Sequence, residues 1–254
     1  MIFDTHAHYD DKAFDPDRRE LLLGLSSAGI GAVTNIGASL ESSQTTLTLA
    51  KEYPWMYAAL GVHPSETAQL NEENFTWLEQ AVREEKCVAV GEIGLDYYWE
   101  EPGHEIQKQW FSRQLALAAG ERLPVVIHSR DAAKDTLDLM KAECAWENGG
   151  VIHCFSYTKE IAREYLEKGF YLGIGGVLTF KNGKKLREVA EYAPLTQLVL
   201  ETDCPYLAPE PHRGTRNFSA NLTYVAQTLA DIKGISREEV EAVTWENAKR
   251  LYRL

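Results

Sequence analysis

His6 and His8 stand one residue apart near the start of the chain, in the stretch FDTHAHYD. Asp4 and Asp10 flank them at the same spacing of two residues. The stretch is expected to begin as a buried strand, where alternate side chains share a face, so these four polar groups should point the same way. Each desolvated polar group costs about 1–3 kcal/mol unless it has a partner. A divalent cation on the imidazoles would satisfy them, and a pair of exposed or hydrogen-bonded histidines is the alternative.

Further potential ligands stand at or near the ends of later apolar runs. They are His63, Glu92, His128, His153 and Asp203. Neighbouring side chains in a strand point to opposite faces, so a cysteine that directly follows a ligand should face away from the site. This places Cys154 and Cys204 outside the ligand set. The remaining nitrogen and oxygen ligands suit zinc, manganese, nickel or magnesium ions.

The number of ligands indicates two ions, because four histidines and two carboxylates exceed what one tetrahedral ion binds. The expected arrangement has one ion on His6, His8 and Asp203, a second on His128 and His153, and a bridging Glu92. Two divalent ions about 3.5–4 Å apart can activate water and neutralise a developing oxyanion. The pattern therefore predicts metal-assisted hydrolysis.

The scaffold for these residues consists of eight apolar or β-branched runs that alternate with stretches of helical period. The runs lie at 2–10, 31–37, 56–64, 87–98, 124–130, 150–156, 170–176 and 197–205. Helical stretches lie at 15–28, 40–52, 73–85, 105–121, 131–143, 158–167, 183–192, 220–232 and 236–251. This alternation predicts one α/β domain over residues 1–254, a single (β/α)8 TIM barrel with an extra C-terminal helix. A doubly wound open sheet is the alternative.

Composition limits the environment and the partners. No apolar run approaches the roughly 20 residues that span a bilayer, the N-terminus lacks a signal-peptide layout, and we expect a cytoplasmic protein. The four cysteines have no CxxC spacing, which argues against a disulfide framework or a thiolate zinc site. The net charge of −12 argues against coating a long duplex, which requires a basic surface.

Motifs along nearly the whole chain carry a family resemblance. They are FDTHAHYD, GVHP, GEIGLDYY, HSRDA, IHCFS, GIGGVLTFKN, ETDCPYL and PHRGTRN, in that order. The chain resembles the TatD family of metal-dependent hydrolases, which implies a TIM barrel of the amidohydrolase superfamily and a divalent-metal-dependent deoxyribonuclease, often trimming DNA from a 3′ end. The resemblance assigns metal ligation to the same residues, His6, His8, Glu92, His128, His153 and Asp203. It also makes Asp203 the acceptor of a proton from the attacking water, so Asp203 and Glu92 are the candidate catalytic residues.

Residues outside the ligand set are candidates for substrate binding. His63 could hydrogen-bond a phosphate oxygen, or it could fix its own loop before Pro64. Arg213 and Arg216 carry the planar fork that suits phosphate, and ordinary surface ion pairs are the alternative. Glu201 shares a strand face with Asp203 and could fix the tautomer of a metal-bound histidine, with a structural ion pair as the alternative.

Two positions depart from the family pattern. Tyr157 stands where Gly commonly follows HCFS, and Phe218 and Ser219 stand where an acidic residue and Pro are usual. Both positions belong to loops at the predicted barrel mouth. They bear on substrate preference more than on metal chemistry.

We expect a deoxyribonuclease that hydrolyses phosphodiester bonds at DNA ends as a 3′-5′ exonuclease, with two divalent ions as cofactors. A different reaction class, hydrolysis of a small ester, lactone or amide, or deamination, is the alternative, because one barrel and ligand set can serve many substrates. A non-enzymatic scaffold that stores metal or binds a partner would not need ligands gathered at one barrel mouth. The expected partner is a transiently bound DNA end, with no membrane and no obligatory protein partner.

Overall fold

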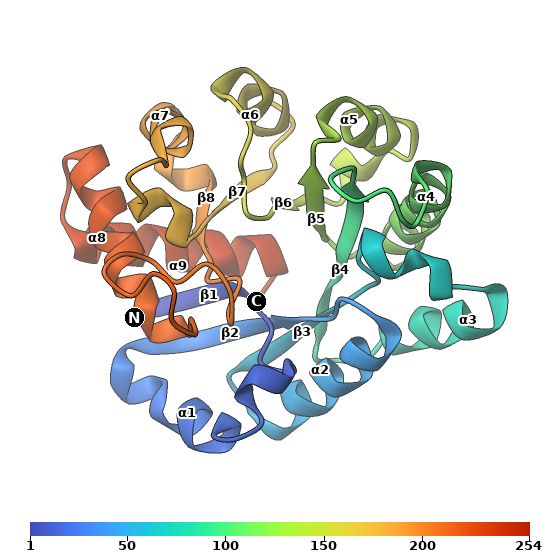
Figure 1. The fold of residues 1–254 in the computed structure, drawn as a ribbon, viewed down its shortest axis with the longest axis horizontal. Helices are drawn as coiled ribbons and strands as arrows, with labels where there is room; N and C mark the ends of the chain where they lie inside the picture. The colour runs from blue at the N-terminus through green and yellow to red at the C-terminus, as the bar shows by residue number, and fades with distance from the viewer.

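The computed structural model describes residues 1–254. Eight parallel strands form one sheet whose order follows the chain (Figure 1). The strands are β1 Ile2–Ala7, β2 Ile30–Ile36, β3 Met56–Leu60, β4 Cys87–Asp96, β5 Val125–Arg130, β6 Gly150–Ile152, β7 Tyr171–Ile174 and β8 Leu198–Leu200. Backbone bonds of 2.9 Å from Asp203 N–H to the His6 carbonyl and from His8 N–H to the Cys204 carbonyl join the first and last strand segments. The sheet thus closes into a barrel, which confirms the predicted TIM barrel and excludes the open sheet.

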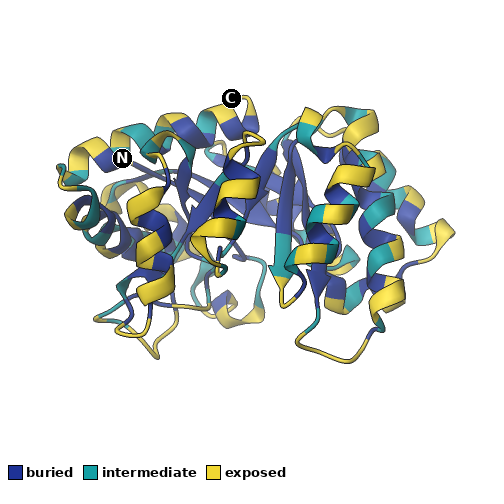
Figure 2. Ribbon diagram, turned by 90° about the horizontal axis from the view of Figure 1, so that it is seen from above, coloured by how far each residue is buried: buried dark blue, intermediate teal, exposed yellow.

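Nine α-helices accompany the strands. They are α1 Arg18–Gly24, α2 Leu40–Glu52, α3 Glu72–Ala81, α4 His104–Glu121, α5 Ala133–Ala142, α6 Lys159–Leu166, α7 Lys184–Tyr192, α8 Leu222–Lys233 and α9 Arg237–Tyr252. The first eight surround the barrel, with exposed outer faces around buried strands (Figure 2). None of the nine combines the length and the apolar character that crossing a membrane would require.

The extra helix α9 closes the end of the barrel at which the strands begin. Ala248, Leu251 and Tyr252 of α9 are buried in one cluster with interior residues of the strands, among them Phe3 and Val126. A larger apolar cluster fills the space between the strands and the surrounding helices. With one end closed by α9, the opposite end, where the strands finish, is left to carry the site.

Strand β1 contains a β-bulge that breaks its alternation. Asp4 pairs with Val33 of β2 and Ala7 pairs with Asn35, so three steps along β1 match two steps along β2. A bulge of this kind shifts the later residues to the other face of the sheet. His6, which follows the bulge, faces the barrel interior.

Asp4, before the bulge, faces outward. Its carboxylate accepts hydrogen bonds of 2.6 Å from the hydroxyls of both Thr202 and Ser219 and lies outside the barrel interior that Phe3 enters. The expectation that Asp4 shares a face with His6 is therefore wrong. The period-two rule fails here because the extra residue in the bulge reverses it.

Candidate metal centre

A cavity of about 760 Å3 opens at the end of the barrel where the strands finish. Seven of the residues singled out from the sequence line it, namely His8, Asp10, His63, Glu92, His128, His153 and Asp203. His6 is almost fully buried beneath them, and its ring stacks on that of His153 at a centroid distance of 4.0 Å. The structure therefore brings all six expected metal ligands together. Four of them lie at the end of a strand or directly after it, whereas Glu92 lies within β4 and Asp203 lies in the loop after β8.

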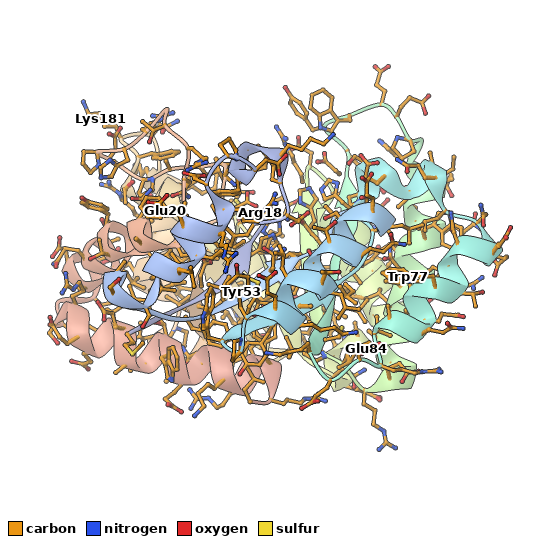
Figure 3. All side chains as sticks on the ribbon, turned by 90° about the horizontal axis from the view of Figure 1, so that it is seen from below. Arg18, Glu20, Tyr53, Trp77, Glu84 and Lys181 are labelled. Atoms are coloured by element: carbon orange, nitrogen blue, oxygen red, sulfur yellow. The ribbon has the colours of Figure 1, made fainter.

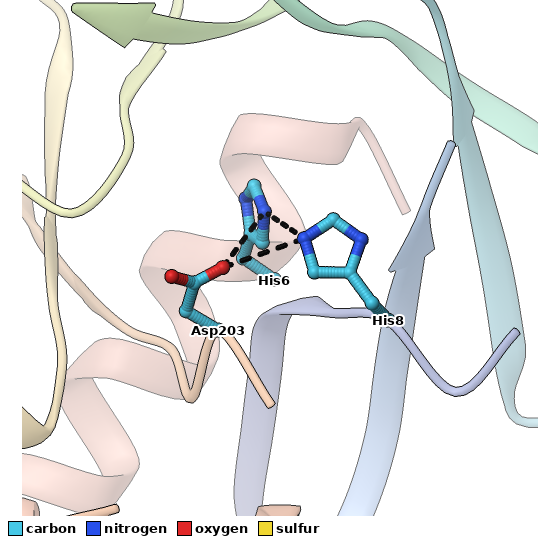
Figure 4. Close-up of side chains that lie close together, drawn as sticks. All are labelled: His6, His8 and Asp203. Carbon is cyan, nitrogen blue, oxygen red and sulfur yellow. Dashed lines mark hydrogen bonds and ion pairs between the residues drawn. The ribbon is translucent and has the colours of Figure 1, made fainter. Parts of the chain in front are cut away.

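The first group of candidate ligands comes from the end of the first strand, β1, and from the loop after the last strand, β8 (Figure 4). Nε2 of His6 and Nε2 of His8 lie 3.1 Å apart. Oδ1 of Asp203 lies 3.4 Å from His8 Nε2 and 3.7 Å from His6 Nε2. These three atoms converge on one point, as ligands of one ion would.

The second group lies on β5 and after β6. Nδ1 of His128 and Nε2 of His153 are 3.3 Å apart, and Oε1 of Glu92 lies 2.8 Å from the first and 2.7 Å from the second. The other Glu92 oxygen, Oε2, faces the first group, at 3.4 Å from His6 Nε2 and 3.7 Å from His8 Nε2. The Glu92 carboxylate thus lies between two pairs of imidazoles, and each of its oxygens faces one pair.

The surroundings of the ring nitrogens that point away from the centre are compatible with a cation at the centre. Nδ1 of His8 lies 2.9 Å from the Ile36 carbonyl, which accepts but cannot donate. The proton of a neutral His8 ring must therefore sit on Nδ1, which leaves the lone pair of Nε2 aimed at His6. Buried Nδ1 atoms of His6 and His153 have no hydrogen-bond partner. Lone pairs that face each other and a carboxylate are satisfied when they share a cation.

Electrostatics at the centre also favours positive charge. Burial disfavours a charged imidazole, yet the Asp203 and Glu92 carboxylates outweigh burial and raise the pKa of His8 to about 10. Glu92 likewise outweighs burial and raises the pKa of His153 to about 9. Burial and the adjacent imidazoles instead lower the pKa of His6 to about 4. The carboxylates would hold a metal cation for the same reason that they hold these protons.

Glu201 lies beside the cluster but deeper in the barrel. It is 1% exposed, accepts a hydrogen bond from the backbone N–H of Cys154, and has one oxygen 3.8 Å from Nδ1 of His153. Burial raises the pKa of Glu201 to about 8. Gly173 provides the room, because a Cβ there would lie 2.2 Å from a Glu201 oxygen. Glu201 thus approaches a candidate ligand without a direct hydrogen bond.

His63 is fixed by its own loop. Its Nδ1 accepts a hydrogen bond from the backbone N–H of Ser65 at 3.2 Å. Burial and the nearby His128 lower the pKa of His63 to about 3, so the ring is neutral and carries its proton on Nε2. This N–H faces the cavity, 3.7 Å from Glu92, and can donate to a bound oxygen.

The two arginines expected to bind substrate do not line the cavity. Arg216 forms a bidentate ion pair with Asp17 at 2.6–2.7 Å. Arg213 is exposed and places its guanidinium 4.3 Å from the centroid of the Phe180 ring. Lys181, the residue after Phe180, is a further cation in this region. It lies at the end of the molecule opposite α9 and does not line the cavity (Figure 3).

Asp96 and Arg130 are among the cavity residues that were not identified from the sequence. Asp96 places Oδ2 3.1 Å from Nε2 of His128 and is almost fully buried. Its position four residues after Glu92 in one strand was the available signal, because an even spacing keeps one face. Arg130, at the end of β5, is the only lysine or arginine in the lining. Its guanidinium lies 3.7 Å from the centroid of the Tyr98 ring.

The residues that depart from the family pattern, Tyr157, Phe218 and Ser219, contact other residues of the protein rather than the cavity. The Tyr157 hydroxyl lies 2.9 Å from the Ser129 hydroxyl and accepts a hydrogen bond from the backbone N–H of Ala132 at 3.2 Å. Ser219 donates to the Asp4 carboxylate, and Phe218 packs on the outer core. Neither departure places a side chain in the cavity lining.

Comparison with known proteins gives whole-chain similarity. A sequence model of a family described as TatD related DNase matches residues 3–253. The uncharacterised metal-dependent hydrolase YabD of Bacillus subtilis is 41% identical over 254 residues, covering 100% of both chains. The 3′-5′ ssDNA/RNA exonuclease TatD of Cronobacter sakazakii is 35% identical over 257 residues, covering 99% of this chain and 97% of that one. The crystal structure of YjjV, a TatD homolog from Escherichia coli, matches with a TM-score of 0.94 and 31% identity, covering 100% of this chain and 98% of that one.

Proposed function

The chain belongs to the family of TatD-related DNases and is a metal-dependent hydrolase, and from this premise we propose that it removes nucleotides from the 3′ end of DNA. The observation that carries the proposal is the Glu92 carboxylate, whose two oxygens face two separate groups of histidines. Such a bridge suits two divalent ions, whether zinc, manganese, magnesium or nickel. One ion would be held by His6, His8 and Asp203, and the other by His128 and His153.

The formal charge of the cavity supports both the ions and an anionic substrate. Five carboxylates line it, those of Asp10, Asp11, Glu92, Asp96 and Asp203, against the single guanidinium of Arg130. With the imidazoles neutral, as metal binding requires, the formal excess of four negative charges would repel a phosphodiester, and two divalent cations would balance it. When bound, the ions would supply Lewis acidity toward water and phosphate oxygens.

The residues of the chain would handle the proton and the substrate. Imidazoles outweigh burial and hold the pKa of Asp203 below its usual range, so its carboxylate is ionised and can accept a proton from the attacking water. The side chain of Asp203 is 19% exposed toward the cavity, which gives water access to it. His63 Nε2 and Arg130 would donate hydrogen bonds to phosphate oxygens. Arg213, which has no ion pair, would contact a phosphate farther along the strand.

The test is a cleavage assay on single-stranded oligonucleotides labelled at the 5′ end or the 3′ end. The protein is first treated with a chelator and then loaded with one metal at a time. A 3′-5′ exonuclease gives a descending ladder from the 5′-labelled strand and a labelled mononucleotide from the 3′-labelled strand. Asp203→Asn protein is the control for contaminating nucleases.

The same preparations should be offered an ester, a lactone, an amide and an aminated base. Turnover of one of these without cleavage of any phosphodiester would contradict the nuclease proposal and leave the hydrolase assignment intact. Internal cleavage of a circular single strand would contradict the restriction to strand ends.

A further inference from the structure

Two large aromatic side chains are exposed at the cavity although they have no place in the metal centre. Trp99 and Tyr206 both line the cavity and are 55% and 56% exposed. Trp99 lies in the loop after β4, and Tyr206 lies in the loop after β8. In a barrel of eight strands in sequential order, β4 and β8 stand on opposite sides of the barrel axis. The two rings therefore belong to opposite walls of the cavity.

The surroundings of each ring limit its freedom but leave it exposed. The Tyr98 ring lies perpendicular to that of Trp99, at a centroid distance of 4.8 Å, while its own face carries the guanidinium of Arg130. The hydroxyl of Tyr206 donates to Oδ2 of Asp11 at 3.1 Å, which ties this ring to the loop after β1. Exposed apolar side chains that share a cavity are typical of binding sites.

Charge alone cannot hold a nucleic acid strand at this cavity. Arg130 is its only cationic side chain other than histidine, and the whole chain has a net charge of −12. Proteins that bind single strands combine phosphate contacts with stacking of bases on aromatic rings, and stacking does not depend on positive charge. The exposed rings supply the kind of contact that the charge distribution does not.

We propose that Trp99 and Tyr206 bind the unpaired bases of a single-stranded DNA end by stacking, one ring on each wall of the cavity. The proposal rests on the nuclease function proposed above and adds the two residues that would contact the bases of its substrate. Bases of a single strand can leave their stack and present their faces to both walls, whereas bases inside a duplex are covered by their neighbours. The rings would thereby select strands with unpaired ends and position the terminal phosphodiester over the metal centre.

The experiment compares Trp99→Ala and Tyr206→Ala with Trp99→Phe and Tyr206→Phe, which keep an aromatic ring. Tyr192→Ala is the matched control, because Tyr192 at the end of α7 is 49% exposed and does not line the cavity. The substrates are a 5′-fluorescein-labelled single strand and the same strand with three abasic sites at its 3′ end. KM is measured with metal-loaded protein, and binding is measured by fluorescence anisotropy in the Asp203→Asn background.

Each Ala variant should raise KM and Kd for the normal strand about 5- to 100-fold, as expected for the loss of one stacked base. The Phe variants should restore most of the affinity, and Tyr192→Ala should match the wild type. The abasic strand should bind wild-type protein weakly, and the Ala variants should weaken it no further. These results together would identify the rings as base contacts.

Unchanged KM and Kd in both Ala variants would overturn the proposal, as would an equal loss on normal and abasic strands. Circular dichroism and thermal unfolding check that each variant is folded. If wild-type protein cleaves no strand with any metal, the nuclease function fails. The anisotropy comparison would still decide whether the rings bind bases.

Discussion

Asp96 holds the ring of His128 by placing its Oδ2 3.1 Å from Nε2. The carboxylate is itself fixed, because its Oδ1 accepts a hydrogen bond from the backbone N–H of Tyr98 at 3.0 Å. Gln107 also bonds both the N–H and the carbonyl of Asp96. With its Nε2 proton directed to Asp96, His128 presents the lone pair of Nδ1 to the metal centre.

Asp96→Asn should therefore weaken binding of one metal ion by about 10- to 100-fold, because the neutral amide orients and polarises the imidazole less well. Isothermal titration of the chelated protein with manganese or zinc measures the effect. Asp138→Asn is the control, since Asp138 is an exposed residue whose carboxylate pairs with Lys134 at 2.5 Å. Equal metal affinity in Asp96→Asn and wild-type protein would remove Asp96 from the centre.

Asp203→Asn should lower kcat by about 10²- to 10⁴-fold while the fold is retained, because the amide cannot accept the proton of the attacking water. The variant should also bind the first ion less tightly, since Oδ1 of Asp203 lies 3.4 Å from Nε2 of His8 in that group. Turnover under saturating metal separates the two effects. A variant that recovers full kcat at high metal concentration would show that Asp203 is a ligand only.

Metal binding should strengthen as pH rises from 6 to 9. In the metal-free protein the pKa values of His8 and His153 are raised to about 10 and about 9, so both rings hold a proton near neutral pH. A metal must displace these protons, and the apparent affinity should rise about tenfold per pH unit for each proton released. Calorimetry in two buffers of different ionisation enthalpy counts the protons. Affinity that is flat between pH 6 and 9 would show that neither ring releases a proton on binding.

The positions of the polar residues were predictable because they depend on the period of single strands. His128, His153 and Asp203 each follow an apolar run, and in parallel strands such positions meet at one end of the barrel. The alternation of side chains along one strand could not show which face Asp4 takes, because that depends on how neighbouring strands pair. The bulge in β1, which turns Asp4 outward, depends on the register between β1 and β2.

Contacts between side chains that are far apart in the sequence also could not be predicted. Arg216 pairs with Asp17, which is 199 residues away, and no local pattern distinguishes this acid from the others in the chain. Arg130 reaches the cavity because β5 ends beside it and because Tyr98 supports its guanidinium. The sequence motif HSRDA contains Arg130 but does not indicate where its side chain lies.

Arg130→Ala should raise KM for oligonucleotides by about 10- to 100-fold, the usual effect of losing hydrogen bonds to a charged group. Arg216→Ala is the control, because its guanidinium is paired with Asp17 outside the cavity, and its KM should match the wild type. Steady-state kinetics on one labelled strand measures both. A larger KM in Arg216→Ala than in Arg130→Ala would reverse this assignment.

Replacement of Asp4 should destabilise the barrel from outside the metal centre. The buried carboxylate accepts hydrogen bonds from the hydroxyls of Thr202 and Ser219 and from the backbone N–H groups of Thr202 and His6. Asp4→Ala removes the shared acceptor of all four donors, although the Thr202 and Ser219 hydroxyls keep contacts with the His6 carbonyl and the Tyr9 hydroxyl. A single unsatisfied buried donor costs about 1–3 kcal/mol, so we expect a loss of at least about 2 kcal/mol. Urea unfolding of the metal-free protein measures the free energy.

Asp4→Asn, which keeps one acceptor oxygen, should lie between Asp4→Ala and the wild type. Because Asp4 faces away from the cavity, both variants should bind two equivalents of metal when folded, with the affinity of the wild type. Unfolding free energies within about 0.5 kcal/mol of the wild type would show that the network does not stabilise the fold. Loss of metal from a fully folded Asp4→Asn protein would place Asp4 in the metal centre after all.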